Sequence, residues 1–360
     1  MKTFKRVQYL LLAVAGLLIG QTLPTLLPSK PPQPIFAVGS DLRSARLSLK
    51  GHYLAGIGCK DGSWFVQVWD QYEKEVLAPQ SLPTPPGRFH ALSWSPDGKD
   101  LAVAAGSEVW IFKIKTGEKR ILAAGPQVRA VEYNGSYLLA HTRTSSVIWK
   151  GDFSKPYWRL DQNRLLLSAL DGNSERLATS CFEDGVRVFD LKRKRQTAHF
   201  KPGWISAGLK FGDGGRLLAV GYRNRSNRSQ DHVITYDLNH GSPYGPALST
   251  PSLYGLDTSL SGERVVTRQY SGAVTWDAKT GNVLSERPGR SRLLDVIDYQ
   301  GDLVCSELEG NTAALWNAED PSKEHLLTCP EPITDMRFTH FNGLILVGGQ
   351  ARVWKTGSAF

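Results

Sequence analysis

Short runs of alternating apolar and polar residues, separated by polar turns, recur along this chain. Residues 90–123 show one complete unit: HALSWS, the turn PDGKD, LAVAA, VWIFKI, the turn KTGEK and RILA. Apolar runs of this length, bounded by Gly, Pro and Asp, are typical of β-strands. No helical periodicity lies between them. The pattern therefore predicts four short strands in a unit of about forty residues.

The unit recurs eight times. Each copy has an aromatic residue before a polar turn, and these residues are 37 to 47 positions apart: Trp69, Phe112, Trp149, Phe189, Tyr236, Trp276, Trp316 and Trp354. The first turn of each copy also contains a glycine, which reaches positive φ without a Cβ clash. These glycines are Gly51, Gly98, Gly135, Gly172, Gly214, Gly262, Gly301 and Gly343.

Repeats of this kind predict an all-β fold, an eight-bladed β-propeller of four-stranded blades. A seven-bladed ring with one divergent copy is the alternative. The last copy ends after its third strand, whereas IFAVG at 35–39 precedes the first copy. We therefore expect residues 35–39 to supply the missing outer strand and close the ring, which would leave no open sheet edge.

Several segments carry a resemblance to a known family: SPDGKDLAVAA at 95–105, EDGVRVFD at 183–190, SGAVTWDAKTG at 271–281 and LWN at 315–317. On these segments the chain resembles the WD-repeat family from about residue 35 to 355. The resemblance implies a propeller that binds proteins or peptides. No copy has the Gly-His dipeptide that the family places before the first strand, so the family's buried His–Ser–Asp–Trp hydrogen-bond set is incomplete here.

The N-terminal segment differs in composition from the repeats. Residues 7–29 contain no charged side chain, and MKTFKR precedes them. This pattern predicts a transmembrane anchor or signal segment at 1–27, a Pro-rich linker at 28–34 and a propeller at 35–360. The basic residues before the apolar stretch favour a cytoplasmic N-terminus, which would place the propeller outside the cytoplasm. The expected location is the cell membrane, as a single-pass protein. The alternative is a secreted or periplasmic protein after signal cleavage.

The net charge of +9 is unevenly distributed. Residues 1–34 contain four of the 43 Lys and Arg residues and no acid, so the remainder has 39 basic residues and 34 acids, a net charge of about +5. A nearly balanced body makes nucleic acid an improbable partner.

The sequence offers no catalytic or metal-binding motif. It has no Gly-x-Ser-x-Gly, no phosphate-binding glycine loop and no His-Glu-x-x-His, and no two of its four cysteines are spaced as zinc ligands. We expect Cys59, Cys181, Cys305 and Cys329 to be unpaired, buried residues, because the repeat separates them too far for disulfides. The predictions are therefore no enzyme activity, no cofactor and no metal.

The longest spacing between copies contains an arginine-rich insertion, GYRNRSNRSQDH at 221–232, between the second and third strands of the fifth copy. Loops in that position emerge on the same face as the connections between blades, which also carry basic residues at 88, 164 and 201. We predict a basic rim for an unknown partner there, with Arg223, Arg225, Arg228, Arg287, Arg290 and Arg292 as the binding residues. The predicted function is a non-enzymatic, membrane-tethered scaffold for protein–protein interaction. The alternative is an extracytoplasmic propeller enzyme or carbohydrate-binding module that uses the mouth of the central channel.

Overall fold

The computed structural model describes residues 34–86, 91–171, 173, 175–182, 184–201, 203–289, 293, 295–298, 300–308, 310–339 and 343–356. All of them belong to one compact unit, Gln33–Phe360. In this part of the chain the secondary structure consists of β-strands and the short 3₁₀ helix η1 (Arg228–Gln230). The unit is therefore all-β, as predicted.

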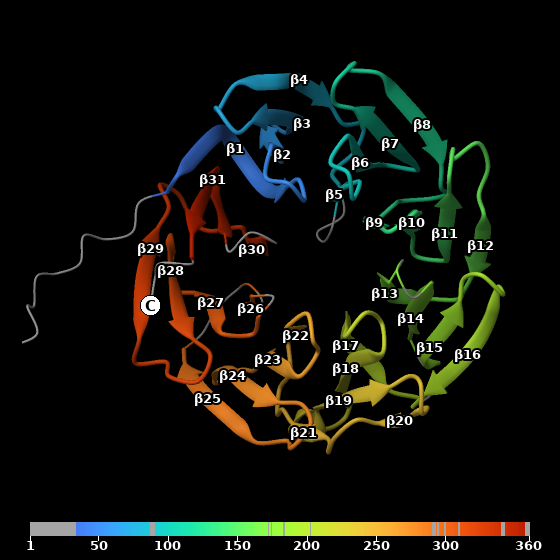
Figure 1. Ribbon diagram of the computed structural model, residues 1–360, viewed down its shortest axis with the longest axis vertical. Helices are drawn as coiled ribbons and strands as arrows, with labels where there is room; N and C mark the ends of the chain where they lie inside the picture. Colours follow the sequence, from blue (N-terminus) through green and yellow to red (C-terminus); the bar gives the residue numbers. More distant parts are fainter. Residues whose placement is uncertain are drawn as a thin grey trace, which may run out of the picture. The chain divides into compact units, whose positions relative to one another are not determined.

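Seven antiparallel sheets follow one another around a ring within this unit (Figure 1). Five of them contain four strands that pair with their neighbours in chain order, as expected for propeller blades. Sheet by sheet, the strands are β5 (Leu92–Trp94), β6 (Asp100–Ala105), β7 (Glu108–Lys113) and β8 (Lys119–Ala123); β9 (Ala130–Asn134), β10 (Tyr137–His141), β11 (Ser145–Lys150) and β12 (Trp158–Asp161); β13 (Leu165–Asp171), β14 (Arg176–Cys181), β15 (Gly185–Asp190) and β16 (Arg195–Phe200); β22 (Gly255–Thr258), β23 (Arg264–Arg268), β24 (Gly272–Asp277) and β25 (Val283–Pro288); β26 (Val296–Ile297), β27 (Leu303–Glu307), β28 (Thr312–Asn317) and β29 (Glu324–Thr328).

One sheet has a divided outer strand. It contains β17 (Ile205–Gly212), β18 (Leu217–Arg223) and β19 (His232–Asp237), and β19 pairs with two short strands, β20 (Ser242–Pro243) and β21 (Leu248–Ser249). Pro243 and Pro246 lie in this outer segment. Because proline has no N–H to donate, it interrupts the ladder of hydrogen bonds, which explains the two short pieces.

The remaining sheet joins the two ends of the ring. Its order is β30 (Asp335–Thr339), β31 (Gly343–Lys355), β1 (Phe36–Leu47), β2 (Tyr53–Lys60), β3 (Ser63–Asp70) and β4 (Glu75–Ser81). The first part of β1 pairs with β31, with Phe36 opposite Val353 and Val38 opposite Ala351. The second part pairs with β2. The prediction that residues 35–39 close the ring is confirmed.

Strand β31 doubles back on itself. A Cβ placed on Gly343 would lie 3.4 Å from the carbonyl oxygen of Trp354, whereas a straight strand would hold these residues about 36 Å apart. β31 therefore supplies two adjacent strands of the last copy, and β1 supplies its outer strand. Counted in this way, the seven sheets are consistent with eight blades.

The aromatic residues that define the repeat are all buried, with exposures between 0% and 7%. They pack between neighbouring sheets. Trp316, for example, belongs to an apolar cluster that joins Val266 and Ala273 of one sheet to Val304 and Ala314 of the next. The repeat spacing thus reflects one large side chain per blade interface.

The turn glycines follow the repeat with one exception. Gly343 is the first residue of β31, where its φ is not positive. Gly172 lies outside the described residues. The other six have positive φ: Gly51, Gly98, Gly135, Gly214, Gly262 and Gly301.

The predicted location at the membrane requires correction. A single-pass protein needs an apolar helix of about 20 residues to cross the bilayer, and no helix in the described ranges is long and apolar enough to do so. The single-pass topology with an extracytoplasmic propeller is therefore wrong on this structure. The hydrophobic helix expected at 1–27 lies outside the described residues, and the boundaries at 27 and 34 stay predictions.

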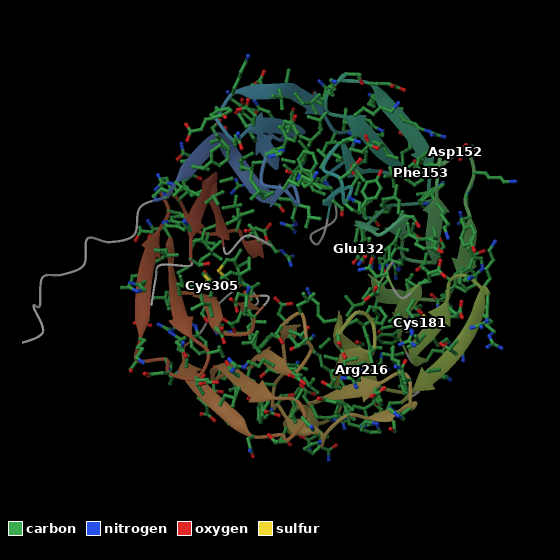
Figure 2. The ribbon with its side chains drawn as sticks, in the orientation of Figure 1. Glu132, Asp152, Phe153, Cys181, Arg216 and Cys305 are labelled. Atoms are coloured by element: carbon green, nitrogen blue, oxygen red, sulfur yellow. The ribbon has the colours of Figure 1, made fainter. Side chains whose placement is uncertain are left out.

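Glu132, in the inner strand β9, has a strongly raised pKa. Glu132 of β9 lies at the inner edge of the ring (Figure 2) and its Oε2 accepts a hydrogen bond of 3.2 Å from Leu170 N of the next sheet. Burial raises the pKa of Glu132 to about 7, against the lowering effect of Lys210. The folded protein therefore keeps a proton on this carboxyl over a pH range in which the unfolded chain has lost it.

This proton makes stability depend on pH. The contribution of protonated Glu132 is fully present below its ordinary pKa of 4.5 and is lost as the pH rises through about 7. Glu132→Gln keeps the acceptor for Leu170 N and removes the ionisation. We expect the variant to be about 1–2 kcal/mol more stable than the parent at pH 8, and unchanged at pH 4.5, in urea denaturation. The exposed Glu286→Gln is the control, and equal effects of both variants at pH 8 would contradict the prediction.

Candidate functional site

One face of the ring carries the loops that can reach a partner. Because the strands of a blade alternate in direction, the connections from second to third strand and from fourth strand to the next blade emerge together. We call this side the loop face. The insertion at 224–231 lies between β18 and β19, the second and third strands of their blade, and so belongs to this face as predicted.

Two arginines of the insertion hold the loop itself. Arg223 Nε and Arg228 Nη2 donate to the carbonyl oxygen of Leu253, at 2.7 and 2.6 Å, and Arg223 Nη2 donates to Tyr254 O at 2.6 Å. Arg228 also pairs with the buried Asp231 at 2.6 Å. These contacts fasten the insertion to the connection that leads into the next blade.

Arg225 takes a different position from its two neighbours. Its guanidinium carbon lies 3.9 Å from the ring centroid of Phe182, in the loop between β14 and β15. Arg164, from the connection between β12 and β13, lies 4.1 Å from the same centroid. One phenyl ring therefore brings together arginines of two blades by cation–π contact.

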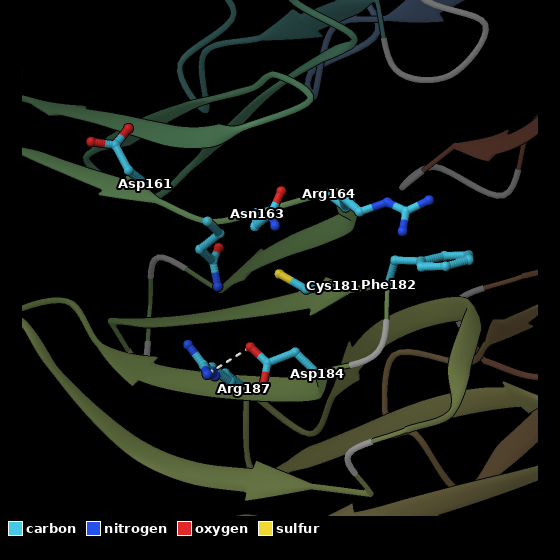
Figure 3. A pocket seen from close by; sticks show the side chains of 8 residues that line it. Asp161, Asn163, Arg164, Cys181, Phe182, Asp184 and Arg187 are labelled. Carbon is cyan, nitrogen blue, oxygen red and sulfur yellow. Dashed lines mark ion pairs between the residues drawn. The ribbon is translucent and has the colours of Figure 1, made fainter.

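Further arginines gather around Phe182. Two adjoining cavities, of about 320 and 340 Å³, share Arg164 and Phe182 in their linings. The second cavity is also lined by Arg129, which precedes β9, and Arg143, between β10 and β11. We call Arg129, Arg143, Arg164 and Arg225 around Phe182 the arginine cluster. Figure 3 shows its Arg164 and Phe182 side by side at the edge of the first cavity.

Backbone hydrogen bonds fix the positions of these loops. Arg129 N donates to His141 O at 2.8 Å, and Phe182 N donates to Arg164 O at 3.1 Å. The carbonyl of Arg143 accepts from Leu165 N of the next blade at 2.9 Å. Arg164 itself has a φ of +52°, a left-handed conformation that non-glycine residues rarely adopt. The cluster is thus built on a tied backbone and includes one strained residue.

The described acids beside the cluster pair with other arginines. The two described acids of the first cavity have arginines of their own: Asp184 pairs with Arg187 at 2.6 Å (Figure 3) and Asp161 with Arg159 at 2.9 Å. Within the described ranges, Arg129, Arg143 and Arg164 have no carboxylate partner.

The buried His141, beside the cluster, has a lowered pKa. Burial, followed by the positive charge of Arg129, lowers the pKa of His141 to about 4. The ring is therefore neutral at physiological pH, and its Nδ1 lies 2.9 Å from Ser168 Oγ. A neutral His141 leaves the arginines as the cationic groups of this part of the loop face.

The other predicted binding residues lie elsewhere. Arg287 is in the outer strand β25, where its Nη2 pairs with Glu324 of β29 at 2.7 Å and its side chain is 15% exposed. The structure thus does not bring Arg287 to the insertion, because β25 is the outermost strand of its own blade. Arg290 and Arg292 lie outside the described residues. A role in binding for these residues stays a prediction.

Three of the four cysteines are unpaired and buried, as expected from the sequence. Cys181, Cys305 and Cys329 are buried and unbonded, whereas Cys59 is unbonded but only half-buried. Cys181 lines the first cavity, where burial raises its pKa to about 11 and makes the thiolate scarce. Among the described residues no three His, Cys, Asp or Glu side chains form a group that could hold a metal ion.

Comparison with known proteins shows the fold. No family model and no curated protein matches the sequence. Solved structures do match: the Dos1 propeller is 14% identical, with a TM-score of 0.68, and covers 91% of this chain and 96% of its own. Sqt1 of Saccharomyces cerevisiae is 11% identical, with a TM-score of 0.68, over 91% and 99% of the two chains. A chain of the Mitotic Checkpoint Complex is 15% identical, with a TM-score of 0.56, over 74% and 87%. The chain is a β-propeller.

The sequence did not single out Arg129, Arg143 or Phe182. Arg129 and Arg143 stand alone in their loops, and Phe182 directly precedes the repeat segment EDGVRVFD. The signal that could have found them is their repeat position: all three lie in loop-face connections of consecutive copies, as do Arg164 and Arg225.

Proposed function

We propose that this chain is an eight-bladed propeller of WD-repeat type, extending over residues 35–360, that acts as a non-enzymatic scaffold. Its loop face binds a partner protein or peptide. The single observation that carries this function is the gathering of arginine and tyrosine side chains on connections that the sheets hold in place.

Two buried tryptophans support the WD-repeat assignment. Trp276 Nε1 donates to Thr267 Oγ1 at 2.9 Å, and Trp316 Nε1 donates to Ser306 Oγ at 3.0 Å. In both copies the bond links the aromatic residue of the third strand to a hydroxyl of the second strand. This is the Trp–Ser part of the hydrogen-bond set that the family resemblance implies.

The composition of the loop face supports protein binding. Tyr254 and Tyr270 are 48% and 54% exposed and lie in the connections before β22 and between β23 and β24. Arg223, Arg225 and Arg228 lie in or beside the neighbouring insertion. Arginine and tyrosine are enriched where proteins bind each other, because they combine apolar contact area with hydrogen-bond donors. A chain of the Mitotic Checkpoint Complex has the same fold within a multiprotein assembly.

An affinity capture with matched variants tests the function. The loop-face variant combines Arg225→Ala with Tyr270→Ala. The control combines Arg193→Ala with Tyr72→Ala, both in turns between third and fourth strands on the opposite face. We expect the full-length parent and the control to retain the same partner, and the loop-face variant to retain about a tenth as much. Equal retention by both variants, or loss only in the control, would exclude the loop face as the binding surface.

A further inference from the structure

We propose that the arginine cluster is the binding site for an acidic segment of a partner protein, whose carboxylates pair with the guanidinium groups around Phe182. This inference rests on the proposed function and adds the chemistry of the partner. It concerns Arg129, Arg143, Arg164 and Arg225, of which sequence reasoning had selected only the last as a binding residue.

Charge complementarity favours an anionic occupant. Arg164 and Arg225 both lie within about 4 Å of one ring centroid, and Arg129 and Arg143 line the adjoining cavity. The guanidinium groups carry charge of the same sign around these cavities, and the described acids of the first cavity pair with Arg159 and Arg187. A carboxylate that enters the cavities would offset this positive charge and accept charge-assisted, bidentate hydrogen bonds. The arginine cluster therefore favours an anionic ligand.

The form of the site favours a peptide as the source of that anion. Each cavity has a volume of about 320 to 340 Å³, room for a few side chains but not for a nucleic-acid groove or a flat bilayer surface. Phe182 is already in contact with two guanidinium groups, so it is engaged where a nucleic-acid base would stack. The exposed tyrosines of the same face, Tyr254 and Tyr270, provide apolar contact for the rest of a bound segment.

The cluster is ready to bind without rearrangement of its loops. The hydrogen bonds of Arg129 N and Leu165 N join the loops to strands of two blades, and Phe182 N joins its loop to that of Arg164. Arg164 keeps its left-handed backbone within this frame. Loops whose backbone is already fixed lose less conformational entropy on binding than mobile loops, which strengthens the interaction with an acidic ligand.

Fluorescence anisotropy with the full-length protein tests the inference. The probe is a labelled peptide of glutamate, glycine and serine, and its uncharged match replaces glutamate by glutamine. The cluster variant is Arg143→Glu with Arg164→Asp, since aspartate tolerates the positive φ of position 164. The control is Lys192→Glu with Arg193→Glu in the turn between β15 and β16, which changes the net charge equally on the opposite face.

We expect the cluster variant to bind the glutamate peptide at least about tenfold more weakly than the parent, and the control to remain within about twofold. The exposed single variant Arg143→Gln should weaken binding about threefold, and it tests the site even if the double variant fails to fold. The glutamine peptide should not bind. Added salt should weaken the interaction in the parent.

Several outcomes would overturn the inference. Equal weakening in the cluster variant and the control would show non-specific attraction. Tighter cluster-dependent binding of single-stranded DNA or of anionic vesicles than of the peptide would assign the site to a different partner. If the peptide does not bind while the parent still captures a protein that the loop-face variant loses, the acidic partner is excluded and the scaffold function stands. If no protein is captured at all, the proposed function fails first.

Discussion

A chain that begins at Ser40 is expected to be about 5 kcal/mol less stable than one that begins at Gln33. The shorter chain lacks the first part of β1, which pairs with β31 and buries Phe36 and Val38. Burial of these two side chains accounts for roughly 1.5–3 kcal/mol each, and the lost backbone pairing adds to it. Urea denaturation of the two chains, followed by tryptophan fluorescence, measures the difference.

The comparison contains its own control, because both chains lack residues 1–32 and differ only at 33–39. The shorter chain should also self-associate, since Ala351 to Val353 of β31 become an open sheet edge. Equal unfolding midpoints, with no association, would mean that the ring does not depend on this closure.

Replacement of Trp316 by alanine should cost about 4 kcal/mol. Its indole is fully buried between two blades, against Val266, Ala273 and Val304. Removal of so large a side chain leaves a cavity in a close-packed interface, and Ser306 loses the hydrogen bond from Trp316 Nε1. Thermal and urea unfolding should both move to lower midpoints.

Trp110→Ala is the matched control. Trp110 lies in β7 but is half-buried and outside the repeat position, where it contacts Lys119 and donates to Glu108. We expect a loss of about 1 kcal/mol there. Similar losses for both variants would contradict the view that the repeated aromatic residue organises each blade interface.

The repeat made the fold predictable. A period of about forty residues with one aromatic residue and one turn glycine per copy reports a local structure that is repeated eight times, so each copy supports the reading of the others. The incomplete last copy and the spare strand at 35–39 even predicted the closure between β1 and β31. Local exceptions escaped the pattern: the outer strand divided around Pro243 and Pro246, and Gly343 within a strand instead of a turn.

The site was less predictable, because it is assembled from loops far apart in the sequence. Arg129, Arg143 and Arg164 come from three separate connections, and only the ring brings them to Phe182. The conspicuous arginine-rich insertion was located correctly, but two of its arginines bond to Leu253 and Tyr254 and so stabilise the loop. A local density of arginine therefore indicated mainly a structured loop, and Arg225 of this loop joins single arginines from three other connections to form the cluster.

Photo-crosslinking tests the central claim, that the loop face of the closed ring binds the partner, most directly. A photoreactive residue replaces exposed Thr144, between β10 and β11 on the loop face, or exposed Lys115, between β7 and β8 on the opposite face. Each protein is irradiated with the partner retained in affinity capture. The structure predicts an adduct from position 144 and none from position 115. An adduct from position 115 alone, or equal adducts from both positions, would contradict the claim.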